Sequence, residues 1–428
     1  MQDNGKKPAL RFKGFTDPWE QRKLGDAFER VVRKNTNNES RLPLTISAQD
    51  GLVDQITYFN NRVASRDVSN YYLVYNGEFA YNKSTSDGYP FGAVKRLDWY
   101  EKGVLSTLYI VFALKHPEKD DSDFMTVFYD TDRWHRGVAE RAAEGARNHG
   151  LLNISADDFF DIDTTMPEDK VEQEKIGRLL KKLDTLITLH QRKYEKLVNI
   201  KKSMLDKMFP QNGASVPEIR FKGFTDPWEQ RKLDEAFDFT VPNNTLSRAE
   251  LNQESGSVRN VHYGDVLIKY GSVLDAQNDE LPFITGRSKD DFKGALLQNG
   301  DIIIADTAED ETTGKVCEIV NIQDKDVVAG LHTMVCRPKN KTAEGYFGYY
   351  MNSSSYHHQL LPLMQGIKVL SLSKTNVQKT TVKYPKDKAE QQKIADCLRR
   401  IDTLITLHQR KLEKLQNIKK SCLEKMFV

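Results

Sequence analysis

Two stretches of the chain place an apolar residue at every seventh position. Residues 167–209 carry this stripe over about five heptads, with a second apolar series four places further on, and residues 385–427 repeat it. Such a period is typical of an α-helix that packs along another helix. The two stretches are identical at 30 of 43 positions without a gap, so each is the nearest candidate partner of the other. The predicted pairing positions are Ile176, Leu183, His190, Leu197, Met204, Ile394, Ile401, His408, Leu415 and Cys422.

A second repeat lies upstream of each predicted helix. Residues 11–28 read RFKGFTDPWEQRKLGDAF and residues 220–237 read RFKGFTDPWEQRKLDEAF, which are identical at 16 of 18 positions. The chain is therefore two tandem halves, each with a framing segment, a variable region and a long helix. Within each framing segment, the sequence TDPWE predicts a turn that enters a helix, with Pro at the first helical position. The linker 210–219 resembles the first ten residues, which indicates a pseudo-twofold object whose termini lie close together.

The variable regions between these repeats are rich in predicted strands. YYLVYNGEFAYNK predicts a hairpin with its turn at Asn76-Gly77, and residues 103–114 predict one strand or a pair. Gly264-Asp265 and Gly300-Asp301 are interpreted as turns that feed apolar strands, and further strands are predicted at KVCEIV and TMVCRP. Both regions end alike before the helix, with Ser155 and Ser373 at matching places.

Together these patterns predict an α+β fold. Two mixed α/β domains alternate with two long coiled-coil helices, and the whole is a pseudo-twofold tandem repeat; the antiparallel direction of the helices is implied by the resemblance given below. The predicted borders are 1–166 for the first domain, 167–209 for the first helix, 210–219 for a linker, 220–384 for the second domain and 385–428 for the second helix.

Composition narrows the class of protein. A chain of 428 residues is too long for one compact core, and 29% charged with 39% hydrophobic residues is typical of a soluble globular protein. No apolar run approaches the roughly 20 residues of a membrane span, and the first residues lack the apolar core of a signal peptide, so a cytoplasmic location is expected. The four cysteines form no CxxC pair. Neither a disulfide framework nor a zinc site is expected.

Charge is unevenly distributed, although its net value is only +2. Residues 168–209 hold 11 Lys/Arg against 7 Asp/Glu and residues 386–428 hold 11 against 6, so the helices carry +9 and the remainder −7. The domains are therefore not broadly basic, and nucleic acid would have to meet local patches. An ordinary solvated helix face explains the helical charge equally well.

No catalytic constellation is recognisable, and neither catalytic nor metal-binding residues are predicted. There is no GxGxxG, no complete phosphate loop and no Asn-Pro-Pro or Asp-Pro-Pro turn of the kind found in amino-methyltransferases. Polar, aromatic and basic residues do gather at predicted strand ends, where such side chains can read base edges and grip phosphates, although polar loops are more often just solvated. The candidate DNA-binding residues are Tyr81, Asn82, Lys83, Ser84, Thr85, Ser86, Tyr89, Arg96, Lys269, Tyr270, Ser272, Arg287, Lys368, Ser371 and Ser373.

With both repeats in view, the chain resembles the DNA-specificity subunit of type I restriction–modification systems. The resemblance rests on RFKGFTDPWEQRKL, on LSLSKTNVQKTTVKYP before the second helix, and on the helix pattern EQxKI, LDTLITLHQRK and IKKSxLxKMF, each in its expected place. It implies that each variable region is a target-recognition domain that reads one half of a split double-stranded DNA site. It also implies that the helices form an antiparallel spacer.

The resemblance further implies a non-catalytic subunit with several partners. It would dock two adenine-N6 methyltransferase subunits, which use S-adenosylmethionine, and restriction subunits, which use ATP and Mg²⁺; this chain itself would bind no cofactor. Two alternatives remain open. One is a self-sufficient methyltransferase or nuclease, and the other is a coiled-coil scaffold that binds only proteins.

Overall fold

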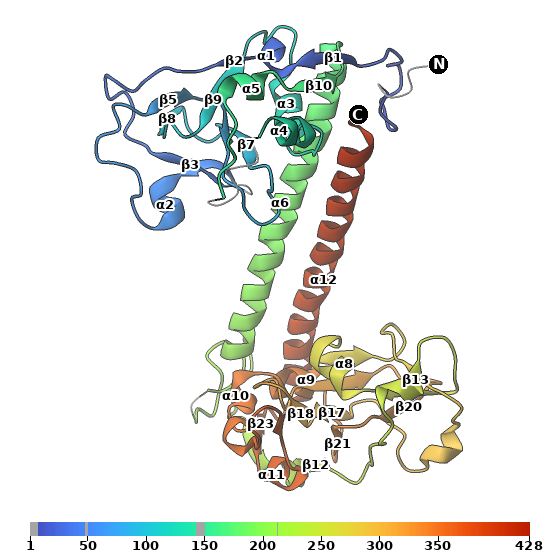
Figure 1. Ribbon diagram of the computed structural model, residues 1–428. Helices are drawn as coiled ribbons and strands as arrows, with labels where there is room; N and C mark the ends of the chain where they lie inside the picture. Colours follow the sequence, from blue (N-terminus) through green and yellow to red (C-terminus); the bar gives the residue numbers. More distant parts are fainter. Residues whose placement is uncertain (1–6, 48–49, 143–149, 212) are drawn as a thin grey trace. The chain divides into compact units, whose positions relative to one another are not determined.

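The computed structural model describes residues 7–47, 50–142, 150–211 and 213–428 (Figure 1). The chain forms two compact units, one made of residues 1–191 with 410–428 and the other of residues 192–409. The two predicted long helices are confirmed as α6 (Lys170–Lys207) and α12 (Lys388–Lys425), of 38 residues each. Each unit contains the first part of one helix and the second part of the other, so the units cut across the borders expected from the repeats.

The first unit is a mixed α/β domain. A four-stranded antiparallel sheet has the order β2-β9-β6-β7, and three further strand pairs are β1-β10, β3-β4 and β5-β8. Its elements are β1 (Glu20–Lys23), α1 (Leu24–Ala27), β2 (Phe28–Arg30), β3 (Leu44–Ser47), β4 (Gly51–Asp54), α2 (Gln55–Phe59), β5 (Tyr72–Tyr75), β6 (Phe79–Asn82), β7 (Ala93–Arg96), β8 (Lys102–Leu105), β9 (Ile110–Leu114), α3 (Ser122–Phe128), α4 (His135–Arg141), α5 (Ala156–Phe160) and β10 (Asp163–Met166).

The second unit is also mixed, with sheets of order β12-β21-β17-β19-β15 and β13-β16-β14-β20 and the pairs β11-β23 and β18-β22. Its elements are β11 (Glu229–Lys232), α7 (Leu233–Ala236), β12 (Phe237–Asp238), η3 (Arg248–Glu250), β13 (Leu251–Asn252), β14 (Val258–Val261), α8 (Tyr263–Ile268), β15 (Val273–Asp275), β16 (Phe283–Ile284), η4 (Lys289–Phe292), β17 (Ile302–Ala305), β18 (Thr307–Ala308), β19 (Val316–Val320), β20 (Asp326–Ala329), β21 (Thr333–Pro338), α9 (Tyr346–Met351), α10 (Ser354–His357), η5 (Leu361–Leu363), β22 (Leu370–Ser371), α11 (Lys374–Gln378) and β23 (Thr381–Tyr384).

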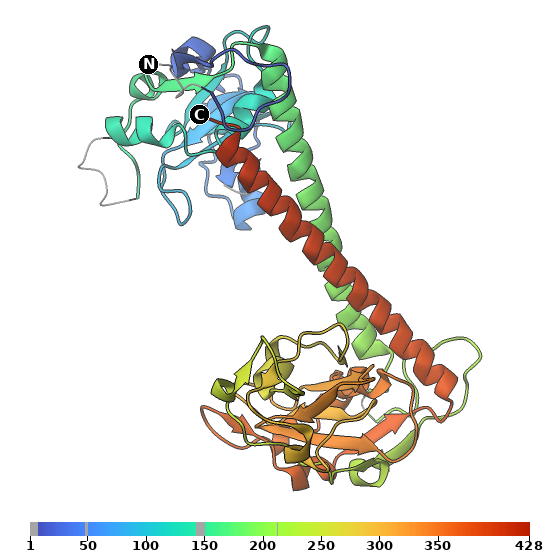
Figure 2. The same ribbon diagram turned by 90° about the vertical axis from the view of Figure 1, so that its right-hand side faces the viewer.

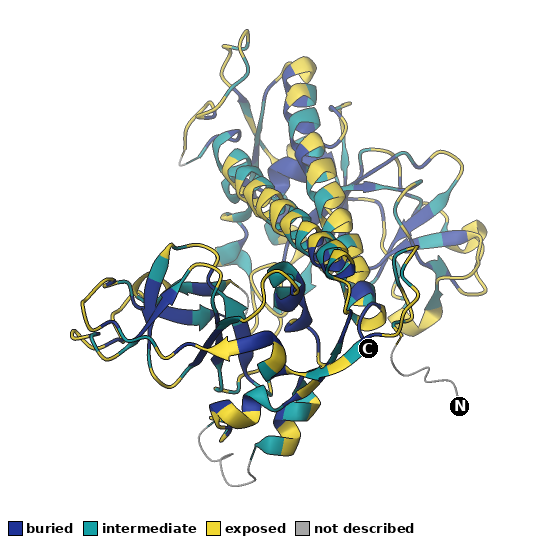
Figure 3. Ribbon diagram, turned by 90° about the horizontal axis from the view of Figure 1, so that it is seen from above, coloured by how far each residue is buried: buried dark blue, intermediate teal, exposed yellow. Residues whose placement is uncertain are grey.

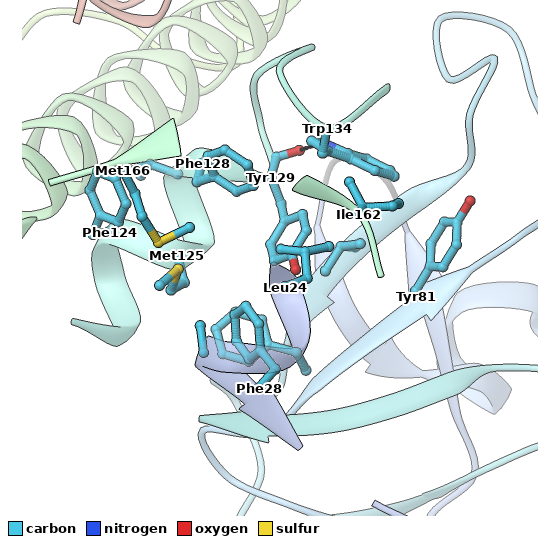
Figure 4. Close-up of a cluster of buried hydrophobic side chains, with 14 of the residues drawn as sticks. Leu24, Phe28, Tyr81, Phe124, Met125, Phe128, Tyr129, Trp134, Ile162 and Met166 are labelled. Atoms are coloured by element: carbon cyan, nitrogen blue, oxygen red, sulfur yellow. Dashed lines mark hydrogen bonds between the residues drawn. The ribbon is translucent and has the colours of Figure 1, made fainter. Parts of the chain in front are cut away.

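An aromatic core joins the elements of the first unit (Figure 4). Phe28 lies edge-to-face with Phe112 at a centroid distance of 4.9 Å, and Tyr129 is edge-to-face with Trp134 at 5.7 Å. Leu180 of α6 belongs to the same cluster. The long helix is therefore part of the domain core and not only a connector.

The helix predicted for TDPWE is wrong in both halves. Residues 20–23 form β1, which pairs antiparallel with β10, and residues 229–232 form β11, which pairs with β23 in the same register. The strand partner lies directly before the long helix. A short helix follows each strand instead, and its first N–H groups, of Leu24 and Leu233, donate to Ile162 and Thr380. The entry to each half is thus tied to the strand that leads into its own long helix.

Two predicted strand features are also wrong. Strands β5 and β6 exist and Gly77 has the turn conformation with φ 86°, but β5 pairs with β8 whereas β6 pairs with β7 and β9. The turn residues bind other segments, since Asn76 N–H donates to Glu101 and Gly77 N–H to Leu97. After Gly264-Asp265 the chain forms α8 and not a strand. The strands predicted within 103–114, 301–305, 315–320 and 333–338 are confirmed.

The two halves close in the same way before their long helices. Ser155 caps α5 by accepting from the N–H of Asp158, and Ser373 caps α11 by accepting from the N–H of Asn376.

Among the helices in the described ranges, none is both long and apolar enough to cross a membrane.

Candidate DNA-binding site and helix pairing

One buried ion pair fixes each framing segment to its long helix. Arg11 holds both carboxylate oxygens of Glu172 at 2.6 and 2.7 Å, and Arg220 holds those of Glu390 at 2.7 and 2.8 Å. The glutamate side chains are 0% and 2% exposed. Two parallel hydrogen bonds give such a pair a defined orientation. The framing segment is therefore locked to the first turn of the helix in both halves.

Further contacts repeat around these ion pairs. Gln173 accepts from the N–H of Asp121, as Gln391 accepts from that of Ala343. A lysine ammonium lies 4.8 Å from a phenylalanine ring in both halves, in the pairs Lys175–Phe15 and Lys393–Phe224. The halves thus build the same frame, although the sequences between the repeats differ.

The end of α12 packs into the first unit, and the end of α6 packs into the second unit. Phe427 lies edge-to-face with Trp19 at 6.2 Å, and Phe209 lies edge-to-face with Trp228 at 6.3 Å. The N–H of Leu10 donates to Lys425 O at 2.8 Å, just as that of Ile219 donates to Lys207 O at 2.9 Å. Within the first unit, Leu10 therefore lies beside the end of α12, whereas residues 1–6, on which the expected closeness of the termini depends, lie outside the described residues.

Matching ion pairs join the two helices in each unit, where the helix segments lie side by side (Figures 1 and 2). Lys419 Nζ is 2.7 Å from Asp184 Oδ1 in the first unit, and Lys201 Nζ is 2.5 Å from Asp402 Oδ1 in the second. Asp184 matches Asp402 and Lys419 matches Lys201 in the repeated helix sequences, so the helix segments of each unit have the same register.

Each variable domain adds a different third group to this ion pair. Asp130 Oδ2 lies 3.3 Å from Lys419 Nζ, whereas in the second unit the Tyr349 hydroxyl donates to Asp402 at 2.9 Å. Burial opposes ionisation of Asp130, but the ammonium groups of Lys95 and Lys419 outweigh it and lower its pKa. One repeated helix pair thus accepts two different domains.

The ten predicted pairing positions differ in burial along the helices. Ile176, Leu183, Ile394, Ile401 and Cys422 are buried. His190, Leu197, Met204, His408 and Leu415 are half-buried, because two helices alone do not surround their seam. The ion pairs between Lys and Asp were missed from the sequence. Their signal was available, since both residues are identical at matching places in the two helices.

The predicted DNA-binding residues of the first domain are only partly at the surface. Ser84 and Ser86 are exposed, whereas Tyr81 is fully buried and its hydroxyl donates to Phe91 O at 2.8 Å. Tyr81 as a DNA contact is therefore a wrong prediction, because reaching it would require opening the core. The guanidinium group of Arg96 donates hydrogen bonds within the domain, to Asp98, Ser122 and Asp123.

Hydrogen bonds hold the residues around Ser84 in place. Lys83 Nζ donates to Ile154 O at 3.3 Å, Asn82 Oδ1 accepts from the N–H of Ser84, and Thr85 donates to Gly150 O. Ser86 and Tyr89 form an isolated bridge. These residues stay candidates for DNA contact, with Ser84 and Ser86 the most accessible of them.

The candidate DNA-binding residues of the second domain are also partly buried and partly exposed. Tyr270 and Ser272 are 4% and 6% exposed, so their prediction as surface contacts is wrong. Lys269 donates to Glu280 O, and Ser373 caps α11. Lys368 and Ser371 are exposed at a hairpin. Arg287 lines a pocket of about 370 Å³.

Asn243, Thr245 and Lys293 also line that pocket, but so do the acidic Asp291 and the apolar Phe292, so its lining is mixed. Its lining residues all lie within 242–295, whereas Lys368 and Ser371 belong to the exposed hairpin that includes β22. Among the described residues, no group of three or more His, Cys, Asp or Glu side chains has the arrangement of a metal site.

A family model described as the type I restriction modification DNA specificity domain matches residues 225–417. The framing segment and helix of the first half repeat the corresponding segments of this match. Within residues 225–417 the chain is therefore similar to the DNA-specificity domain of type I restriction–modification systems. A curated relative matches more of the chain. The Type I restriction enzyme MjaVIII specificity subunit of Methanocaldococcus jannaschii is 24% identical over 331 residues, which are 75% of this chain and 72% of that protein.

The fold is similar to that of a solved structure. The crystal structure of a type I restriction–modification S subunit from M. genitalium superposes with a TM-score of 0.55 and 15% identity, and covers 99% of both chains. At this identity the likeness concerns the fold alone.

Proposed function

We propose that this chain selects a split DNA site, with each variable domain reading one half. One observation carries the proposal. The same frame, held by Arg11–Glu172 in one half and Arg220–Glu390 in the other, surrounds domains without comparable sequence identity. A repeated frame sets two different recognition surfaces in equivalent positions, and a target with two different half-sites is what such surfaces fit.

The long helices would set the distance between the half-sites. Each has 38 residues, which corresponds to about 57 Å at a rise of 1.5 Å per residue. Sites on one face of DNA recur about every 34–36 Å. The ion pairs Lys419–Asp184 and Lys201–Asp402 oppose sliding of one helix along the other. A fixed register would therefore give one permitted spacing, whereas a flexible tether would accept many.

Partner subunits would dock on the outer helix surface (Figure 3). Leu189 and the matching Leu407 are each 44% exposed, and the exposed Arg192 and Arg410 next to them are also identical. Exposed apolar side chains that recur in both helices indicate a protein contact made twice. Two methyltransferase subunits would fit this arrangement. In this proposal they supply S-adenosylmethionine and adenine-N6 methyl transfer, while restriction subunits supply the ATP- and Mg²⁺-dependent cleavage.

Reconstitution separates this proposal from its alternatives. The purified chain, its methyltransferase partner and the mixture are each incubated with plasmid DNA and labelled methyl donor. The proposal expects site-dependent methylation by the mixture alone. Methyl transfer by the chain alone would support a self-sufficient enzyme. Failure of the mixture to bind DNA in a gel shift, with the protein complex intact, would support a scaffold that binds only proteins.

A further inference from the structure

In the first unit, the variable domain contacts the helix pair through an aspartate. Asp130 lies just after α3, with one carboxylate oxygen 3.3 Å from Lys419 Nζ and the other 2.9 Å from Lys95 Nζ. Lys419 Nζ is in turn 2.7 Å from Asp184 Oδ1, so the contact ends on the ion pair that joins α12 to α6. The four side chains are 18–39% exposed. Partial burial weakens the screening of their interactions by salt.

The second unit makes the same connection with different chemistry. Tyr349 of α9 is 1% exposed, and its hydroxyl donates to Asp402 Oδ2 at 2.9 Å. The other carboxylate oxygen of Asp402 is 2.5 Å from Lys201 Nζ, in the ion pair that repeats Lys419–Asp184. An aspartate of the first domain thus meets the lysine of the helix pair, whereas a tyrosine of the second domain meets the aspartate.

A second pair of matching helix positions behaves alike. Lys181 Nζ lies 3.3 Å from Asp98 Oδ2 and 3.8 Å from Asp123 Oδ1 of the first domain. Arg399, which occupies the matching place on α12, donates to the backbone carbonyl of Glu344 at 2.9 Å. The helix supplies a cation both times, while the domain supplies carboxylates in one unit and a carbonyl oxygen in the other. Each variable domain therefore carries its own groups for contact with a nearly constant helix surface.

Both contacting groups are presented from rigid parts of their domains. The N–H of Asp130 donates at 3.1 Å to the carbonyl of Val127, which belongs to the core. In the second domain, the buried carboxylate of Glu318 holds the start of α9 by accepting from the N–H groups of Gly345 at 2.6 Å and Gly348 at 2.9 Å. Because neither group can shift independently of its domain, tilting of the domain on the helices would break the contact.

We infer that Asp130 and Tyr349 are positioning residues, which fix each variable domain on its helix segments and so narrow the range of half-site spacings that the complex accepts. Adding or removing one base pair between the half-sites shifts one of them by about 3.4 Å and rotates it by about 35°. A domain that follows the shifted half-site must tilt on its helices and lose this contact. The contact therefore opposes binding to a wrong spacing, although it is made within the protein alone. The inference rests on the proposed function and names residues that control the spacing.

The test compares two nearly isosteric variants with matched controls, in the full chain assembled with candidate methyltransferase subunits. Asp130→Asn removes the charge, and Tyr349→Phe removes only the hydroxyl. Asp161→Asn is the control for the first variant, because Asp161 also accepts from two cationic side chains, neither of them on a long helix. Tyr270→Phe is the control for the second, because this buried hydroxyl donates to Glu280 O within the domain. Thermal unfolding and sedimentation of each complex check folding and partner assembly.

The probes are duplexes that carry the methylated motif mapped by sequencing, with the parent spacer or with a spacer one base pair longer or shorter. Each variant should bind the parent spacer as tightly as the unsubstituted complex does. It should bind the altered spacers about tenfold more tightly than that complex does, because a hydrogen bond to a charged group contributes about one decade or more. The two controls should leave the ratio of the dissociation constants unchanged.

An unchanged ratio in either variant would overturn the inference for its domain while leaving the proposed function standing. An equal loss of affinity for all three spacers would also overturn it, since that is the result of a domain that is merely destabilised. If the unsubstituted complex shows no preference among the spacers, the proposed function fails first and the inference with it.

Discussion

A fragment of residues 1–212 is expected to form a symmetric dimer. In the full chain, the first unit is completed by the end of α12, whose Phe427 packs on Trp19. The end of α6 plays the same part in the second unit through Phe209 and Trp228. A second copy of the fragment could therefore supply the end of its own α6 in place of the missing α12. The dimer would carry the first variable domain twice.

The cost of this exchange follows from the residues that change. Most of the completing side chains are kept, as Phe209 for Phe427, Met208 for Met426, Lys201 for Lys419, Leu197 for Leu415 and Leu205 for Leu423. Lys201 would then meet Asp184 and Asp130 as Lys419 does. The main misfit is Met204 in place of Cys422, which is 8% exposed in the first core. Enlarging a packed side chain costs about 1–3 kcal/mol at each of the two equivalent sites.

Sedimentation equilibrium over a range of concentrations measures this dimer. Met204→Cys should remove the misfit and tighten the dimer about tenfold or more, because each 1.4 kcal/mol is one decade in Kd. Phe209→Ala should give a monomer, since truncating a buried phenylalanine costs about 3–5 kcal/mol. A monomeric parent fragment, or a Met204→Cys fragment that dimerises more weakly, would refute the reciprocal completion of the units.

Arg220→Ala should lower the free energy of unfolding by about 3–5 kcal/mol in urea titrations, because it leaves the 2% exposed Glu390 carboxylate without its partner; a loss no greater than that of Arg231→Ala, whose ion pair is exposed, would contradict this. Burial raises the pKa of Glu318 to about 7 from an ordinary value of 4.5, so stability should fall as pH rises between these values and stay level above them. Thermal unfolding at several pH values should show this slope in the parent and lose it in Glu318→Gln, and an equal slope in both would exclude Glu318 as its source. Replacing residues 29–151 by the matching region of a relative should change one half of the methylated motif and keep the spacing, whereas a change in both halves would contradict separate reading.

The long helices could be predicted because their signal is local and repeated. A seven-residue apolar period survives in both copies, and the antiparallel partner is the other copy. The helices end slightly before the predicted limits, since Met208 and Phe209 leave α6 to join the second core beside Trp228. The repeat therefore correctly marked Met208 and Phe209 as packed residues, but it wrongly extended α6 beyond Lys207.

The framing segment could not be predicted in the same way. Its strand, with the sequence EQRK, contains no apolar alternation, and its partner β10 is more than a hundred residues away. The Asn-Gly signal correctly located a turn but not which strands would pair around it. These are properties of distant contacts, and a single sequence does not encode them in neighbouring residues.

The candidate DNA-binding residues show a further limit. Tyr81 lies in β6 and Tyr270 follows α8. Polar sequence neighbours indicated a surface at both places, yet both residues are buried and both hydroxyls donate to carbonyl oxygens inside the domain. Tyr58 and Phe59 are the opposite case, because both are exposed. An apolar pair in a short helix is usually part of a core, and only the fold places it at the surface.

N6-methyladenine is sequenced in DNA from cells that express the chain with candidate methyltransferase and restriction subunits, to test whether each variable domain reads one half of a split site. The proposed function predicts one motif with two short, different half-sites separated by a fixed number of unspecified base pairs. A continuous motif, or a pair of half-sites whose spacing varies from site to site, would contradict it.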